Sequence, residues 1–98
     1  MRLSTYEVDA IKDTFKDIFQ NGDIYLFGSR IDDDKKGGDI DLYIKLSSPL
    51  QIKDMMVKKS KFRLKLEDKI GEQKIDIIIS RDTSRPIEKE ALQKGIKL

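Results

Sequence analysis

Residues 39–46 alternate strictly between two kinds of side chain, and this run constrains the fold more than any other segment. The aliphatic positions are Ile40, Leu42, Ile44 and Leu46, and the positions between them hold Asp39, Asp41, Tyr43 and Lys45. Successive side chains of a β-strand point to opposite faces of its sheet, so the run predicts a strand with one apolar and one polar face. The chain therefore has to build a sheet that keeps two carboxylates outside its core.

Two other segments are predicted to be strands. Residues 24–27 form a short apolar run that ends at Gly28, which is too short for a helix and typical of a strand buried on both faces. Residues 74–79 are rich in β-branched isoleucine, which favours a strand. Alternate isoleucines share one face of this strand, and Asp76 lies on the opposite face. The sequence thus predicts three main strands.

Helical spacing of apolar residues predicts the first helices. Ser4 and Glu7 form a capping box ahead of such a pattern, which predicts a helix over residues 5–20. Ser48 followed by Pro49 is typical of the start of a second helix.

The apolar positions of residues 58–70 fit both a helix and an alternating strand. We expect a helix, because Ser60 can cap it and Gly71 can end it. A last short helix is expected over residues 87–94, ending at Gly95.

The order helix, strand, strand, helices, strand, helix predicts an α+β (α/β) fold, with helices packed on a small mixed sheet of three main strands. The chain has 98 residues, which allows one modest core. Residues 1–98 are therefore expected to form a single domain.

Composition excludes several kinds of chemistry. The chain has no His and no Cys, so His-based triads, thiolate zinc sites and Cys nucleophiles are impossible. Any metal would be held by oxygen, which favours a hard cation such as Mg²⁺. We expect a cytoplasmic protein without a signal peptide or membrane span, because the first residues lead directly into a charged amphipathic stretch and no apolar run approaches the ~20 residues of a span.

Basic residues are densest over residues 53–69, where seven basic residues stand against three acidic ones. A nucleic-acid binder shows such a stripe, but a solvated helix face shows it more often. Phe62 is the only aromatic residue among these lysines, so the stacking platform of a single-strand binder is missing. The sequence disfavours nucleic acid as a partner.

Asp39, Asp41 and Asp76 are candidate metal ligands. Asp39 and Asp41 project from one face of a strand, and Asp76 joins them if the two strands are neighbours. Like charges so close repel one another unless a cation lies between them, and carboxylates around one or two Mg²⁺ ions are the arrangement of two-metal phosphoryl transfer. The alternative is that each Asp is a solvated strand or turn residue, which suits Asp39 after two glycines better than Asp76 among isoleucines.

Gly28 and Ser29 follow the first strand and are candidates for phosphate binding. Glycine lets the backbone approach a ligand closely, and Ser29 offers a hydroxyl and an N–H to a phosphate. A Gly-Ser turn alone is a weak indication, and its value comes from its place next to the strand that carries the carboxylates.

These motifs together resemble the polymerase-beta-type nucleotidyltransferase superfamily. Residues 26–30 read Leu-Phe-Gly-Ser-Arg, nine residues separate Ser29 from Asp39, and Asp39-Ile40-Asp41-Leu42 follows. Lys74-Ile75-Asp76-Ile77 resembles the strand of the third carboxylate. The likeness is to the minimal nucleotidyltransferases, small antitoxin-like proteins partnered with HEPN toxins, and it covers nearly the whole chain.

The resemblance implies a Mg²⁺-dependent nucleotidyltransferase, which transfers an NMP unit from ATP or another nucleoside triphosphate to an acceptor hydroxyl. The expected NMP is AMP. Asp39, Asp41 and Asp76 would be catalytic and bind one or two Mg²⁺ ions. Gly28, Ser29 and Arg30 would bind the nucleotide.

The family also implies a protein acceptor, namely a small helical HEPN-type protein, which would make this chain a protein adenylyltransferase in a toxin–antitoxin system. The alternative is a non-catalytic subunit that binds and neutralises such a toxin. We further expect the apolar residues of the C-terminal tail and the first helix to contribute to a surface for a partner or for a second copy of the chain.

Overall fold

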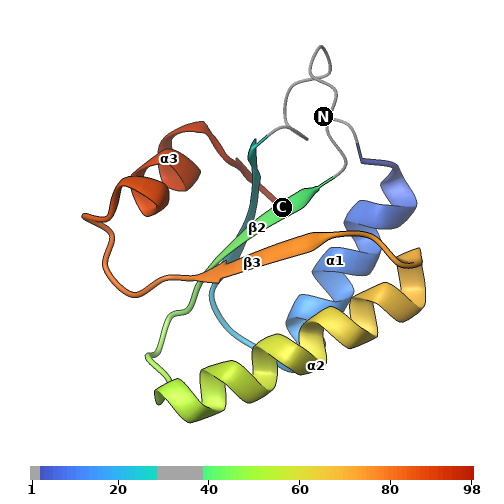
Figure 1. Cartoon of the computed structure of the whole chain (residues 1–98), viewed down its shortest axis with the longest axis horizontal. Coiled ribbons are helices and arrows are strands. Elements are labelled where there is room, and N and C mark those ends of the chain that lie inside the picture. Colours follow the sequence, from blue (N-terminus) through green and yellow to red (C-terminus); the bar gives the residue numbers. More distant parts are fainter. Residues whose placement is uncertain (1–2, 29–38) are drawn as a thin grey trace.

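Three helices and a four-stranded sheet make up the part of the chain that the structure describes, residues 3–28 and 39–98 (Figure 1). The elements of this computed structural model are, in chain order, α1 (Thr5–Ile18), β1 (Asp23–Phe27), β2 (Ile40–Lys45), α2 (Ile52–Ile70), β3 (Ile75–Ile79), α3 (Pro86–Lys94) and β4 (Ile96–Lys97). The predicted α+β class and the three main strands are confirmed, and β4 is a short addition.

The sheet is mixed and has the strand order β3-β2-β1-β4. β1 runs antiparallel to both of its neighbours, whereas β2 and β3 are parallel. A parallel pair needs a crossover connection, and α2 provides it. The strand order makes β3 an edge strand. It lies next to α2, the helix that precedes it, as Figure 1 shows.

α1 begins with the predicted capping box. The Ser4 hydroxyl oxygen accepts a hydrogen bond from the Glu7 N–H, and the Glu7 carboxylate accepts one from the Ser4 N–H, both at 3.1 Å. The helix ends at Ile18, two residues before the predicted end. The chain turns back there towards β1, and Gln20 adopts a positive φ of 67° in this turn.

α2 differs most from the prediction. The two helices expected from Ser48 and Ser60 are one continuous helix that begins only at Ile52, so both predicted starts are wrong. The chain needs residues 46–51 to pass from the end of β2 to the layer of α2, and this requirement overrides the Ser-Pro signal. The predicted end at Gly71 is confirmed. In the described parts of the chain, no helix is long and apolar enough to cross a membrane.

The main core lies between the sheet and the α1–α2 layer. Its residues are the alternate side chains of β1, β2 and β3 and the inner faces of both helices: Ala10, Ile11, Phe15, Phe19, Ile24, Leu26, Ile40, Leu42, Ile44, Phe62, Leu66, Ile75, Ile77 and Ile79. The alternation predicted for residues 39–46 is thus confirmed on its apolar side. Burial of these side chains supplies most of the driving force for folding.

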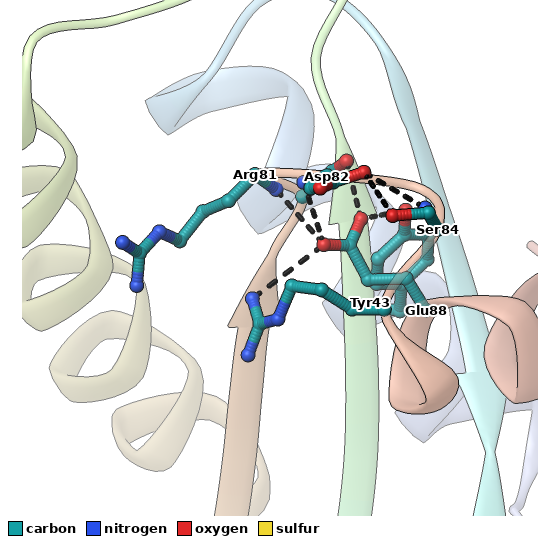
Figure 2. A network of polar contacts seen from close by, with 7 residues as sticks. Tyr43, Arg81, Asp82, Ser84 and Glu88 are labelled. Carbon is teal, nitrogen blue, oxygen red and sulfur yellow. Dashed lines mark hydrogen bonds and ion pairs between the residues drawn. The ribbon is translucent and has the colours of Figure 1, made fainter.

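α3 covers part of the opposite face of the sheet, and the buried carboxylate of Glu88 attaches it there (Figure 2). One oxygen accepts hydrogen bonds from the Tyr43 hydroxyl at 2.7 Å and the Ser80 hydroxyl at 2.6 Å. The other accepts from the backbone N–H groups of Arg81 at 3.1 Å and Asp82 at 2.9 Å. The single carboxylate therefore joins α3 to β2 and to the turn after β3.

The hydrogen bonds to Glu88 decide its charge. Burial by itself raises the pKa of this carboxyl group, but the bonds donated by Ser80, the Asp82 N–H, Tyr43 and the Arg81 N–H outweigh burial and lower the pKa from 4.5 to about 2. Glu88 is therefore ionised at every pH at which the protein is ordinarily studied.

The C-terminal tail is part of the sheet. β4 pairs with β1, and the Leu98 N–H donates to the Ile24 carbonyl at 2.9 Å. Ile87 and Ile96 remain 38% exposed. The expected association surface on the tail and α1 stays a prediction.

Replacing Glu88 by Gln is expected to lower the free energy of unfolding at pH 7 by about 3 kcal/mol, because an amide nitrogen would face donors that now bond to a carboxylate oxygen. The pKa of Glu88 is lower in the folded than in the unfolded chain. Its contribution to stability is therefore complete above pH 4.5 and is lost as the pH falls towards about 2.

Urea unfolding of the wild type, E88Q and E90Q between pH 7 and pH 2 measures both effects. Glu90 is exposed on the same helix and serves as the matched control. If E88Q lost stability in acid as steeply as the wild type, the assignment of that loss to Glu88 would be wrong.

Candidate functional site

Asp41 and Asp76 lie side by side on the polar face of the sheet. Each is the second residue of its strand, and the parallel register of β2 and β3 pairs them directly. Paired residues on neighbouring strands, about 4.8 Å apart, point to the same face. The structure thus brings together two of the three carboxylates that the sequence singled out.

The carboxyl group of Asp41 lies in an unfavourable electrostatic environment. Burial raises its pKa, and the negative charges of Asp76 and Asp39 and a hydrogen bond with Asp76 raise it further, while Lys74 lowers it by a smaller amount. Two carboxylates this close favour a shared proton or a cation between them. The pair is therefore suited to cation binding at a pH where both groups are ionised.

Gly28 brings the backbone against this pair from the end of β1. Phe27 is paired with Asp41 in the antiparallel register, and Gly28 follows with a φ of +76°. A Cβ atom on Gly28 would collide with the Asp41 carboxylate, which would have to move aside. The positive φ, which L side chains rarely adopt, favours glycine at this position.

Asp39 lies just before β2 and has a different partner. Its carboxylate forms an ion pair with the Lys74 ammonium group at 3.3 Å, and both side chains are exposed. Such an exposed pair is screened by solvent and contributes little to stability. Asp39 is thus near the other two carboxylates, close enough to raise the pKa of Asp41, but is held by a basic side chain.

A divalent cation fits this donor set in one specific way. Within residues 3–28 and 39–98, no group of three acidic side chains is arranged to hold a metal by itself. Mg²⁺, however, usually takes only one or two carboxylates from a protein and completes its shell with water and substrate phosphates. The Asp41–Asp76 pair meets that requirement, and Asp39 becomes available if the exposed Lys74 contact opens.

The pair lies in an open groove of about 460 Å³. The lining residues come from every layer of the fold: Phe27, Asp41, Lys59, Arg63, Asp76, Ile77, Ile78 and Ile87. Lys59 and Arg63 belong to the basic stripe of residues 53–69, for which the sequence favoured a solvated helix face. Sequence reasoning missed their place beside the carboxylates, and the only available signal was the density of positive charge.

Ser29 and Arg30, the other nucleotide-binding residues suggested by the resemblance, lie outside the described residues. Gly28 is the last described residue before them, so the chain enters that segment directly beside Asp41. Their role stays a prediction.

Comparison with known proteins gives one result. The family model described as polymerase beta, nucleotidyltransferase matches residues 9–98, a span that contains Gly28, Asp41 and Asp76. No curated protein matches the chain. Because the match covers nearly all of the sequence, the chain belongs to the polymerase-beta nucleotidyltransferase family.

Proposed function

We propose that this nucleotidyltransferase transfers an NMP unit from a Mg²⁺-bound nucleoside triphosphate to a hydroxyl group of a partner protein. The proposed NMP is AMP. Membership of the family supports nucleotidyl transfer. The observation that carries the proposal further is the pairing of Asp41 with Asp76 in an open groove, with Gly28 directly against Asp41.

Each residue has a stated role in the proposed reaction. The oxygen of the acceptor hydroxyl bonds to the α-phosphorus, the bond from that phosphorus to the bridging oxygen breaks, and pyrophosphate leaves with the electron pair. Asp76 is exposed at the edge of the sheet and accepts the proton of the acceptor hydroxyl. Asp41 and Asp76 would hold Mg²⁺, which neutralises charge that develops on the phosphate oxygens. Gly28 leaves room for the nucleotide phosphates beside Asp41.

The partner in this proposal is a small helical HEPN-type protein, as the resemblance implies. The alternative function is a non-catalytic subunit that binds such a protein. One observation favours the alternative, namely that Asp39 pairs with Lys74 instead of joining the other two carboxylates. We give preference to catalysis because that contact is exposed and weak, while Asp41 and Asp76 are aligned by the sheet itself.

The proposed function predicts that Mg²⁺ and ATP bind together. The metal ion and the triphosphate neutralise each other's charge, so both together should raise the melting temperature more than the sum of their separate effects. Thermal unfolding and titration calorimetry with ATP and the other nucleoside triphosphates measure this. The absence of heat and of stabilisation at millimolar concentrations would contradict autonomous nucleotide binding.

The proposed function also predicts the effects of replacing Asp41 by Asn. The folded protein retains the proton on Asp41 to a higher pH than the unfolded chain does, so ionisation of Asp41 lowers the free energy of unfolding as the pH rises through its pKa. D41N removes that charge and should leave the melting temperature at pH 7 unchanged or raised. It should also abolish stabilisation by Mg-ATP and reduce transfer of label from α-labelled ATP by at least about 10²–10³-fold.

D13N is the matched control for D41N. Asp13 is exposed on α1, on the other side of the sheet, and its loss removes the same charge. D13N should transfer label at the wild-type rate. Catalysis would be refuted if D41N modified the partner as fast as the wild type, or if the wild type silenced the partner without ever transferring label.

A further inference from the structure

Lys59 and Arg63 form the α2 wall of the groove, on the side of β3 away from Gly28. From β1 across the sheet, the groove presents Phe27, then Asp41, then Asp76, and finally these two basic side chains, and Gly28 lies against Asp41 at the β1 end. If the nucleotide phosphates lie beside Gly28, as the proposed function holds, the basic pair lies on the side from which the acceptor hydroxyl approaches Asp76.

Lys59 and Arg63 carry positive charge that no ion pair neutralises in the described residues. The Arg63 Nε atom is buried and has no hydrogen-bond partner in the described structure. Lys59 and Arg63 line the groove, and hydrogen bonds from their charged ends to an anion are among the stronger ones in proteins. The groove therefore offers a site for negative charge next to its own carboxylates.

The same side of α2 also carries exposed apolar side chains. Ile52 and Met56 are 70% and 64% exposed, and the spacing 52, 56, 59, 63 places all four residues on one side of the helix. Arg81 lies with Ile52, Met56 and Lys59 around an adjoining hollow, and Figure 2 shows its side chain pointing away from the Glu88 network. This side of α2 therefore combines exposed apolar groups with three positive charges.

A protein segment suits this surface better than a nucleic acid does. Phe62, the only aromatic residue among the basic residues of α2, is fully buried, so α2 offers no ring to stack on a base. Exposed Ile52 and Met56 match the apolar groups of a protein surface, whereas interfaces with nucleic acids are predominantly polar.

We propose that Lys59 and Arg63 bind carboxylates flanking the acceptor hydroxyl, so that the preferred acceptor is a hydroxyl-bearing residue in an acidic segment of a partner protein. This inference rests on the proposed function. It adds that specificity for the acceptor is set by α2, and that the apolar residues Ile52 and Met56 contact the same partner segment.

A random copolymer of glutamate and tyrosine is a suitable probe, because it supplies hydroxyl groups among carboxylates. Binding of the fluorescently labelled copolymer in the presence of Mg-ATP is measured by anisotropy for the wild type and for K59A/R63A. We expect the double substitution to weaken binding about tenfold or more, because hydrogen bonds to charged groups are lost. Stabilisation by Mg-ATP should remain as in the wild type.

K53A/K61A is the matched control, because Lys53 and Lys61 are exposed on α2 and do not line the groove. It removes the same charge and should weaken copolymer binding less than about twofold, as expected for peripheral charges. Equal losses in both variants would show an effect of overall charge and overturn the proposal. So would a loss of Mg-ATP stabilisation in K59A/R63A, or tighter binding of an oligothymidylate at the same residues.

Transfer of label to the copolymer separates this inference from the proposed function. Transfer by the wild type that is unchanged in K59A/R63A would refute the inference and leave nucleotidyl transfer intact. Binding that depends on Lys59 and Arg63 without any transfer would refute catalysis and support the role of α2 in docking an acidic segment.

Discussion

The parallel pairing of β2 with β3 is the constraint on which both the core and the site depend. One register places Ile75, Ile77 and Ile79 in the core and Asp76 beside Asp41. A slip of β3 by one residue would turn its isoleucines away from the core and Asp76 into it. Burial of three isoleucines therefore enforces the proximity of two carboxylates that repel each other when both are ionised.

The polar face of the sheet is divided between a closed and an open region. At the closed region, Glu88 holds α3 against Tyr43, and its carboxylate accepts hydrogen bonds from Tyr43, Ser80 and two backbone N–H groups and pairs with the Arg85 guanidinium. At the open region, burial and the negative charges of Asp76 and Asp39 raise the pKa of Asp41 instead of lowering it. The same fold thus contains a carboxylate that stabilises it and a pair that favours a proton or a cation between its members, and perturbed groups of the second kind are common at functional sites.

Local signals predicted the elements they control directly. The capping box fixed the start of α1, and alternation identified the faces of β2. The start of α2 could not be predicted, because its position depends on the path from the end of β2 to the helix layer. β4 has only two residues, and it forms because β1 offers an unpaired edge. Neither the path nor the edge exists until the tertiary structure has formed.

The sequence by itself determined which residues could carry the chemistry. Carboxylates in alternating strands and a glycine after a buried strand are local patterns, because side-chain period and backbone freedom are properties of single segments. Only the tertiary structure decided that Asp39 pairs with Lys74, that Gly28 lies against Asp41, and that Lys59 and Arg63 line the groove. These contacts join residues from different elements, and their positions depend on strand order and on the burial of α2, which no local pattern encodes.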